Sequence, residues 1–238
     1  MMKLLYEREE ILKYSLKMLK SGLTTGSGGN LSVFNRKEGL IAITPSGVEY
    51  PDMRVEDVIL LDINGNIDHS TEDFFSNDSD IGKNLVHTLN IPSNKPSSEA
   101  GFHIALYRHR PDINAVVHTH SPYATTFACL NREILPVHYL VAFAGKKVPV
   151  APYAAFGTKE LADNIISTID NYNAILLANH GLVAVGSSIQ NAFNAAEEIE
   201  LVARICYQAE CIGKPVMLSD NEMDIVIEKF KTYGSGKR

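Results

Sequence analysis

Short apolar segments rich in β-branched residues alternate with segments of helical periodicity along this chain of 238 residues. The apolar runs have the length of strands, and the segments between them place apolar residues three or four positions apart. Because helices and strands are interspersed, the sequence predicts one layered α/β domain over residues 1–238. We expect a glycine-rich turn that runs into a strand over 24–33, and further strands at 40–44, 58–62, 113–118, 148–151, 174–179 and 182–185. We expect helices at 5–20, 98–109, 121–130, 158–169, 188–212 and 219–231.

Bulk composition excludes several classes of protein. Hydrophobic residues make up 45% of the chain and charged residues 21%, which suffices for a core without covalent cross-links. The net charge of −6 argues against a nucleic-acid-binding surface. The three cysteines are an odd number without a Cys-x-x-Cys motif, and the N-terminus is acidic, without the apolar core of a signal peptide. Such cysteine usage makes a disulfide framework unlikely, so we expect a cytoplasmic protein. In addition, no run has the length of a membrane span.

Residues 66–96 differ in composition from the rest of the chain. They are rich in Asp, Asn and Ser and include two prolines. Such a composition is typical of a surface excursion or a lid, with a short helix at 81–89. We therefore expect an acidic, Asn/Ser-rich insertion at about 68–95.

Two histidines two positions apart end the apolar run Val116-Val117-His118-Thr119-His120. Side chains alternate between the faces of a strand, so His118 and His120 point the same way and can reach one ion. A third histidine, His180, lies in another apolar run. Packed imidazoles with ordinary hydrogen bonds are the alternative, but clustered buried imidazoles without a metal carry a desolvation cost. The three residues therefore predict a catalytic metal site with an open position.

Glu99 follows Pro96-Ser97-Ser98 in the first turn of a predicted helix, with Ser97 or Ser98 as its N-cap. An acidic residue there can simply complement the helix dipole. It can also be a carboxylate that binds the metal at rest and moves protons during turnover. The spacing leaves both interpretations open.

Three short polar turns carry small residues and backbone donors: Gly26–Asn30, Pro45-Ser46-Gly47 and Ser97-Ser98. Together they can form an anion-binding nest, to which a helix N-terminus adds. Each alone is as consistent with an ordinary turn, and the motif of a nucleotide-binding P-loop is missing from the chain. Tyr139 is a candidate general acid or a core residue, and Tyr233 lies in the C-terminal tail.

These motifs together resemble the class II aldolase/adducin family over nearly the whole chain. The C-terminal Phe230-Lys231-Thr232-Tyr233-Gly234 and the context of Tyr139 resemble its fuculose-phosphate branch more specifically. The remaining motifs that carry the resemblance are Gly28-Gly29-Asn30-Leu31-Ser32, Ile43-Thr44-Pro45-Ser46-Gly47, Pro96-Ser97-Ser98-Glu99, Ala115–His120, Ala151–Thr158, Asn179-His180-Gly181-Leu182 and Leu218-Ser219-Asp220.

The resemblance implies a three-layer α/β/α sandwich around a mixed, mostly antiparallel sheet, and a homotetramer with active sites at subunit interfaces. It implies one Zn²⁺ per subunit on His118, His120 and His180, with Glu99 as fourth ligand and proton shuttle. Tyr139 would donate a proton from the neighbouring subunit, and Tyr233 would help to close the site. Substrate phosphate would bind Gly29, Asn30, Ser46, Gly47, Ser97 and Ser98.

The implied reaction is the reversible cleavage of L-fuculose 1-phosphate, or a similar ketose 1-phosphate, to dihydroxyacetone phosphate and L-lactaldehyde or a similar aldehyde. A sugar-phosphate 4-epimerase of the ribulose 5-phosphate type is the sister alternative, although such enzymes typically carry Asp where Glu99 stands. A methylthioribulose-phosphate dehydratase is a weaker relative, and a non-catalytic adducin-like domain has no need of all four ligands. A Schiff-base aldolase prefers a lysine in an apolar segment, which is missing here. The long connection at 68–95 departs from the family and bears on which sugar is used.

Overall fold

The computed structural model describes residues 2–68 and 95–232. Most of the expected insertion at 68–95, its helix at 81–89, and Tyr233 lie outside the described residues. The strands are β1 (Asn30–Asn35), β2 (Leu40–Ile43), β3 (Ile59–Asp62), β4 (Ala115–Thr119), β5 (Val150–Ala151), β6 (Ala174–Leu177) and β7 (Gly181–Gly186). The helices are α1 (Leu5–Lys20), α3 (Ala100–His109), α4 (Pro122–Cys129), α5 (Lys159–Ile169), α6 (Ile189–Ile212) and α7 (Asp220–Thr232), with 3-10 turns η1 (Val55–Asp57) and η3 (Tyr139–Phe143).

The seven strands form one sheet in the order β3-β2-β1-β4-β7-β6-β5. Among the described residues, the pairing of β5 with β6 is parallel and the other five pairings are antiparallel. Strand β4 lies in the middle of this order, between β1 and β7. The expectation of a mixed, mostly antiparallel sheet is confirmed.

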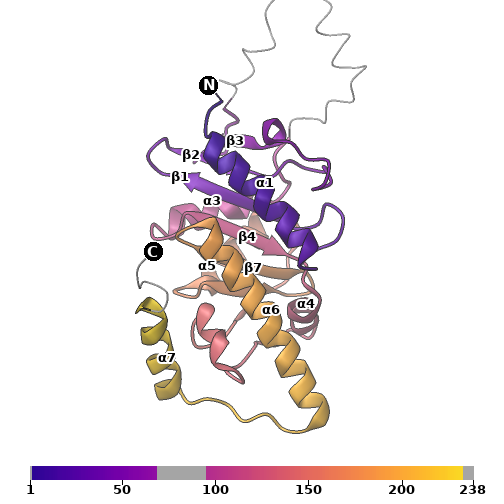
Figure 1. Cartoon of the computed structure of the whole chain (residues 1–238), viewed down its shortest axis with the longest axis vertical. Coiled ribbons are helices and arrows are strands. Elements are labelled where there is room, and N and C mark those ends of the chain that lie inside the picture. Colours follow the sequence, from indigo (N-terminus) through magenta and orange to yellow (C-terminus); the bar gives the residue numbers. More distant parts are fainter. Residues whose placement is uncertain (1, 69–94, 233–238) are drawn as a thin grey trace, which may run out of the picture.

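Helices cover both faces of the sheet, as Figure 1 shows for α1 and α6 on one side and α3 and α5 on the other. Successive strand residues point to opposite faces, so Val117 and Leu182 pack toward α1 and α6 while Val116 and Val183 pack toward α3 and α5. These two apolar layers, separated by the sheet, are the α/β/α sandwich that the resemblance implied.

Local capping explains where several helices begin. The hydroxyl of Thr158 accepts a hydrogen bond from the backbone N–H of Leu161 at the start of α5, and Ser188 does the same for Asn191 at the start of α6. Before α7, the backbone N–H and the hydroxyl of Ser219 both donate to the Glu222 carboxylate. These caps place the three helix starts within one residue of their predicted positions.

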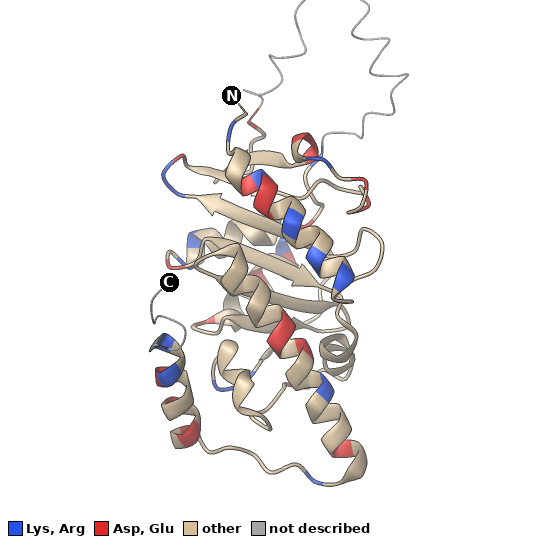
Figure 2. Cartoon of the chain, viewed as in Figure 1, with Lys and Arg blue, Asp and Glu red and all other residues tan. Residues whose placement is uncertain are grey.

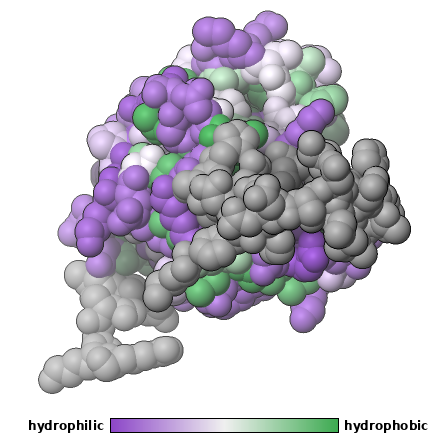
Figure 3. Space-filling model, turned by 90° about the horizontal axis from the view of Figure 1, so that it is seen from above, coloured by the Kyte–Doolittle hydropathy of each residue, from purple (hydrophilic) through white to green (hydrophobic). Residues whose placement is uncertain are grey.

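The surface of the described chain carries mixed charges. Along α1 and α7, acidic side chains lie mostly toward the N-terminal end and basic side chains toward the C-terminal end (Figure 2). Seen from above, hydrophilic and hydrophobic residues are interspersed outside the part drawn in grey (Figure 3). Within residues 2–68 and 95–232, none of the helices combines the length and apolar character that crossing a membrane requires.

Candidate metal centre and anion-binding cavity

His118 occupies the central strand of the sheet. In the sheet register it lies opposite Asn30 of β1 and Val183 of β7, and its side chain is completely buried. It shares a face of β4 with Val116, the face covered by α3 and α5. The strand therefore directs this imidazole toward the N-terminal end of α3, where Glu99 lies.

Three imidazoles converge at this end of β4. His120 directly follows the strand, and its Nε2 lies 3.1 Å from Nε2 of His118. One nitrogen from each of His118, His120 and His180 lies within 4.8 Å of the others. His180 lies between β6 and β7, as the predicted strands at 174–179 and 182–185 require, and it ends a turn that Asn179 permits with a positive φ of 55°.

Glycine at position 181 allows the His180 turn to approach β4. A Cβ atom at Gly181 would lie 2.3 Å from the backbone oxygen of Thr119 and 3.3 Å from the His118 ring. Gly29, just before β1, likewise allows its backbone to approach β4, since a Cβ there would lie 2.5 Å from the His118 backbone oxygen. Both glycines are therefore required for backbone segments to pack against the histidines.

We expect Gly181→Ala to weaken metal binding and destabilise the fold. The added methyl group must displace backbone of β4, a shift that typically costs about 1–3 kcal/mol. Thermal unfolding and a zinc titration with a chelating dye measure both effects. Gly213→Ala is the matched control, because a Cβ at Gly213 meets nothing within 4 Å. Equal melting temperatures and zinc affinities for the two variants would contradict the argument.

Glu99 is the N-cap residue of α3, which begins at Ala100, one or two residues later than predicted from Ser97 or Ser98 as the cap. Its carboxylate makes no capping bond and is buried against the histidines. Oε2 lies 3.3 Å from Nε2 of His118, and Oε1 lies 3.5 Å from Nε2 of His180. Complementing the helix dipole therefore does not account for this side chain.

The hydrogen bonds of His118 determine which of its nitrogens is free. Nδ1 lies 2.9 Å from the backbone oxygen of Leu182, which can only accept, so Nδ1–H donates and Nε2 keeps its lone pair. Burial, together with the charge that His120 would carry, lowers the pKa of His118 to about 3. Burial, followed by the proximity of His118, lowers the pKa of His180 to about 4 against the opposing effect of Glu99. The imidazoles are therefore neutral at neutral pH.

The three imidazoles could hold a divalent cation, and the Glu99 carboxylate lies beside two of them. Nitrogen and oxygen ligands about 2.1 Å from a tetrahedral zinc lie about 3.4 Å from one another. The observed separations of 3.1, 3.3 and 3.5 Å agree with this spacing. In addition, Oε1 of Glu99 is buried and has no hydrogen-bond partner among the described residues. An unpaired carboxylate oxygen beside three neutral imidazoles offers donors that a divalent cation could bind.

We expect the stability of the metal-free protein to fall as the pH drops below about 6.5. Below this pH the histidines of the unfolded chain are protonated, whereas the imidazoles of the folded protein stay neutral. The free energy of unfolding therefore decreases as the pH falls, until the pH reaches the lowered pKa of the folded state. For the fully buried His118, with a pKa of about 3, the loss between about pH 6.5 and pH 4 is about 3 kcal/mol.

Urea unfolding in EDTA at about pH 7, 5.5 and 4.5 measures this loss. His118→Asn should flatten the pH dependence, whereas His109→Asn, at an exposed histidine of α3, should leave it unchanged. A free energy of unfolding that is independent of pH over this interval would contradict the buried neutral state.

A cavity of about 350 Å³ opens beside the imidazoles. The backbone brings its loops together: Pro45 and Pro96 form an isolated bridge, and Ser97 N–H donates to Thr44 O at 3.0 Å. No lysine or arginine lines the cavity in the described part of the chain, so an anion there would meet backbone N–H groups and hydroxyls. The lining contains all six predicted phosphate-binding residues with Glu99, His120 and His180: Ser27, Gly28, Gly29, Asn30, Pro45, Ser46, Gly47, Ser97, Ser98, Glu99, His120, Phe156 and His180.

Of the two tyrosines predicted to act in the site, Tyr139 is among the described residues and Tyr233 is not. Tyr139 begins η3, is about half exposed, and packs against His138 and against Phe230 of α7. It is not among the described residues that line the cavity of its own chain. Tyr233 lies outside the described residues, so its expected part in closing the site stays a prediction.

Sequence reasoning missed several residues around the site. Tyr50 is buried, and its hydroxyl donates toward the backbone oxygens of Gly28 and Gly29 at 3.1 and 2.8 Å, which anchors the glycine turn. His103, one turn beyond Glu99 in α3, is completely buried and hydrogen-bonds Asn30. No sequence pattern around Tyr50 indicates its role. His103 could have been found, because it follows Glu99 by four positions on the same helix, and residues at this spacing lie on the same helix face.

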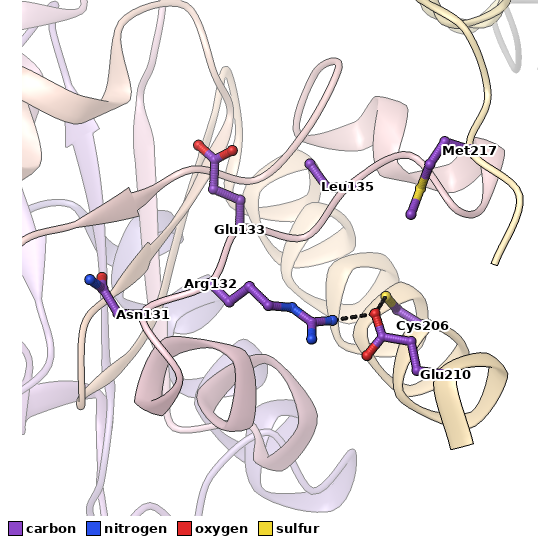
Figure 4. A pocket seen from close by; sticks show the side chains of 7 residues that line it. All are labelled: Asn131, Arg132, Glu133, Leu135, Cys206, Glu210 and Met217. Atoms are coloured by element: carbon purple, nitrogen blue, oxygen red, sulfur yellow. Dashed lines mark hydrogen bonds and ion pairs between the residues drawn. The ribbon is translucent and has the colours of Figure 1, made fainter. Parts of the chain in front are cut away.

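A second cavity, of about 370 Å³, lies between the segment that follows α4 and the C-terminal half of α6 (Figure 4). Its guanidinium group, on Arg132, is paired with Glu210, which also accepts a weak bond from the Cys206 thiol. Burial, followed by the proximity of Glu210, raises the pKa of Cys206 to about 11, which makes the thiol a poor nucleophile. The histidine cavity is therefore the better candidate for chemistry.

Comparison with known proteins agrees with this geometry. Residues 9–207 match the family described as "Class II Aldolase and Adducin N-terminal domain". The chain is 47% identical to a 5-deoxy-D-ribulose 1-phosphate aldolase of Bacillus thuringiensis serovar kurstaki over 96% of this chain and 97% of the relative. It is 38% identical to the L-fuculose phosphate aldolase of Escherichia coli K12 over 94% of both.

Solved structures give the same answer. One of them, titled L-fuculose 1-phosphate aldolase, superimposes with a TM-score of 0.83 at 41% identity, covering 95% of this chain and 96% of the other. Sequence similarity and fold both extend over nearly the full length of the relatives. The chain therefore belongs to the class II aldolase and adducin family, as an enzyme of its lyase branch, the class II aldolases.

Proposed function

We propose that this enzyme cleaves a ketose 1-phosphate reversibly to dihydroxyacetone phosphate and a short aldehyde, with Zn²⁺ as its metal. The observation that carries the proposal is one cavity that joins the imidazole cluster and Glu99 to an uncharged anion nest. 5-Deoxy-D-ribulose 1-phosphate is the first candidate substrate, because the relative with 47% identity bears that name. L-Fuculose 1-phosphate, the substrate named for the relative with 38% identity, is the second candidate.

The nest would hold the phosphate through Gly29, Ser46, Gly47, Ser97 and Ser98, with one N–H of Asn30. Binding energy from this remote group orients the sugar carbonyl toward the histidines and Glu99. A divalent cation on His118, His120, His180 and Glu99 would supply Lewis-acid polarisation of that carbonyl and would stabilise negative charge as the carbon–carbon bond breaks. Zinc suits three imidazole nitrogens and one carboxylate.

In the cleavage direction, a base accepts the proton of the C4 hydroxyl, the C3–C4 bond breaks, and C4 becomes the aldehyde carbon; the acceptor would be the deprotonated form of the same group that donates a proton to the aldehyde oxygen in the reverse direction. The electron pair stays on C3, and Glu99 returns a proton to C3, which completes dihydroxyacetone phosphate. In the reverse direction the aldehyde oxygen needs a proton donor, for which Tyr139 is our candidate. Because Tyr139 does not line the described cavity of its own chain, this role requires a neighbouring subunit, which favours a homotetramer with interfacial sites.

Purified enzyme incubated with each ketose 1-phosphate, and coupled to detection of dihydroxyacetone phosphate, tests the proposal. We expect kcat/KM to be higher for 5-deoxy-D-ribulose 1-phosphate, which releases acetaldehyde, than for L-fuculose 1-phosphate, which releases L-lactaldehyde. A higher kcat/KM for L-fuculose 1-phosphate would instead indicate that this sugar phosphate is the preferred substrate. A C4-epimerised sugar phosphate without dihydroxyacetone phosphate would overturn the aldolase proposal in favour of the epimerase alternative.

A further inference from the structure

A chain of buried polar side chains leads from the interior of the α3 side to Glu99. Its members are Tyr107 and His103 of α3 and Ser32 and Asn30 of β1, each less than one-tenth exposed. The Tyr107 hydroxyl lies 2.7 Å from Ser32 Oγ, which lies 2.6 Å from His103 Nδ1. His103 Nε2 lies 2.6 Å from Asn30 Oδ1, and Asn30 Nδ2 lies 2.8 Å from Glu99 Oε2.

Only one arrangement of protons satisfies every contact. An amide oxygen can only accept, so His103 Nε2–H donates to Asn30, and the amide of Asn30 donates to the Glu99 carboxylate. Burial lowers the pKa of His103 well below its usual value, so the ring is neutral and Nδ1 is bare. The Ser32 hydroxyl must then donate to Nδ1, and the Tyr107 hydroxyl must donate to Ser32.

This order determines which way the Asn30 amide faces. If His103 carried its proton on Nδ1, Asn30 would turn its NH₂ group toward the bare Nε2 and its oxygen toward Glu99. Two oxygens would then oppose each other in a buried site, at a considerable desolvation cost. With His103 protonated on Nε2, Oε2 of Glu99 accepts from Asn30, and Oε1 is left without a hydrogen bond among the described residues, 3.5 Å from His180 Nε2.

We propose that His103 is a positioning residue that, through Asn30, fixes the Glu99 carboxylate for metal binding and proton transfer, with Ser32 and Tyr107 holding its Nε2–H tautomer. The inference rests on the proposed function for the role of Glu99 in turnover. His103 is fully buried and is not among the described residues that line the cavity, but it contacts Asn30, which is. Asn30 can hold Glu99 and still bind phosphate as proposed above. Its amide nitrogen carries two N–H groups, and the bond to Glu99 uses one of them.

The tautomer is measured directly, without substrate. Long-range ¹H–¹⁵N spectra of histidine-labelled protein, metal-free and with zinc added, identify His103 by comparison with His103→Gln. We expect the Nε2–H tautomer in both forms, and in Ser32→Ala we expect a mixture of the two tautomers. An Nδ1–H tautomer in the wild-type protein would overturn the proposal.

Kinetics and zinc affinity test the consequence. His103→Leu removes the donor to Asn30, and we expect kcat to fall about 10- to 100-fold and zinc affinity to fall about tenfold, with KM within about twofold of wild type. His103→Gln restores an N–H near Nε2 and should return kcat to within about fivefold. His109→Leu, at an exposed histidine of the same helix, is the matched control.

If His103→Leu does not fold, Ser32→Ala is the substitute variant. It removes a single oxygen atom, and with it the hydroxyl that donates to Nδ1 of His103 and favours the Nε2–H tautomer. Wild-type kcat and zinc affinity in whichever of these variants folds would overturn the positioning role. If the wild-type enzyme itself lacks aldolase activity, the proposed function fails. The tautomer and the zinc affinity then still decide whether His103 positions Glu99.

Discussion

Glu99→Gln is expected to leave the protein folded while lowering kcat about 10²- to 10⁴-fold, the range typical of a lost general acid–base group. Gln has nearly the same shape and can still accept the amide hydrogen of Asn30, so the buried bond at 2.8 Å survives. What disappears is the negative charge beside the three neutral imidazoles and the ability to deliver a proton. The effect should therefore appear in kcat far more than in the melting temperature.

Steady-state kinetics with a ketose 1-phosphate, together with thermal unfolding, measure this split. Glu38→Gln, on the exposed turn between β1 and β2, is the matched control and should behave as wild type. A Glu99→Gln enzyme with nearly native kcat would remove Glu99 from proton transfer. A large drop in melting temperature for the metal-free variant would instead assign Glu99 to the stability of the fold.

Removal of the metal, or of one imidazole that holds it, is expected to have the second large effect. Lewis-acid stabilisation by a cation is worth several kcal/mol, so EDTA should lower turnover about a thousandfold or more, and added zinc should restore it. His120→Asn should have the same effect as the chelator. Two imidazole nitrogens and one carboxylate then remain, and we expect this smaller set of ligands to lose the metal. His120 follows β4 and is partly exposed, so the substitution leaves the sheet intact.

Zinc content by mass spectrometry of the native protein and activity before and after chelation check this expectation. His109→Asn should retain both zinc and activity, since that side chain is exposed and far along α3 from Glu99. Full activity in EDTA with no bound metal would eliminate the metal from the reaction. Zinc bound by His120→Asn with native affinity would show that this imidazole is not a ligand.

Much of the fold followed from local pattern. The alternation in Val116-Val117-His118-Thr119-His120 predicted two imidazoles directed to one point, and their Nε2 atoms lie 3.1 Å apart. Helices were predicted to start at Thr158, Ser188 and Ser219, and in the structure these side chains cap the helices by hydrogen bonds that act within three residues. The first of the two strands around His180 was predicted to end at 179 but ends at Leu177, because the apolar run outweighed the signal of Asn179, a residue type that tolerates positive φ.

The sequence by itself determined the alternating strands and helices, the family resemblance and the types of side chain that can bind a metal, because these depend on neighbours within a few positions. Only the tertiary structure decided how Glu99 is used. Its Oε2 is held by Asn30, 69 positions away, and Asn30 is oriented by His103, 73 positions away. Hydrogen bonds over such separations arise from the packing of α3 against β1 and β4, which no local pattern specifies. The orientation of the carboxylate therefore exists only in the folded chain.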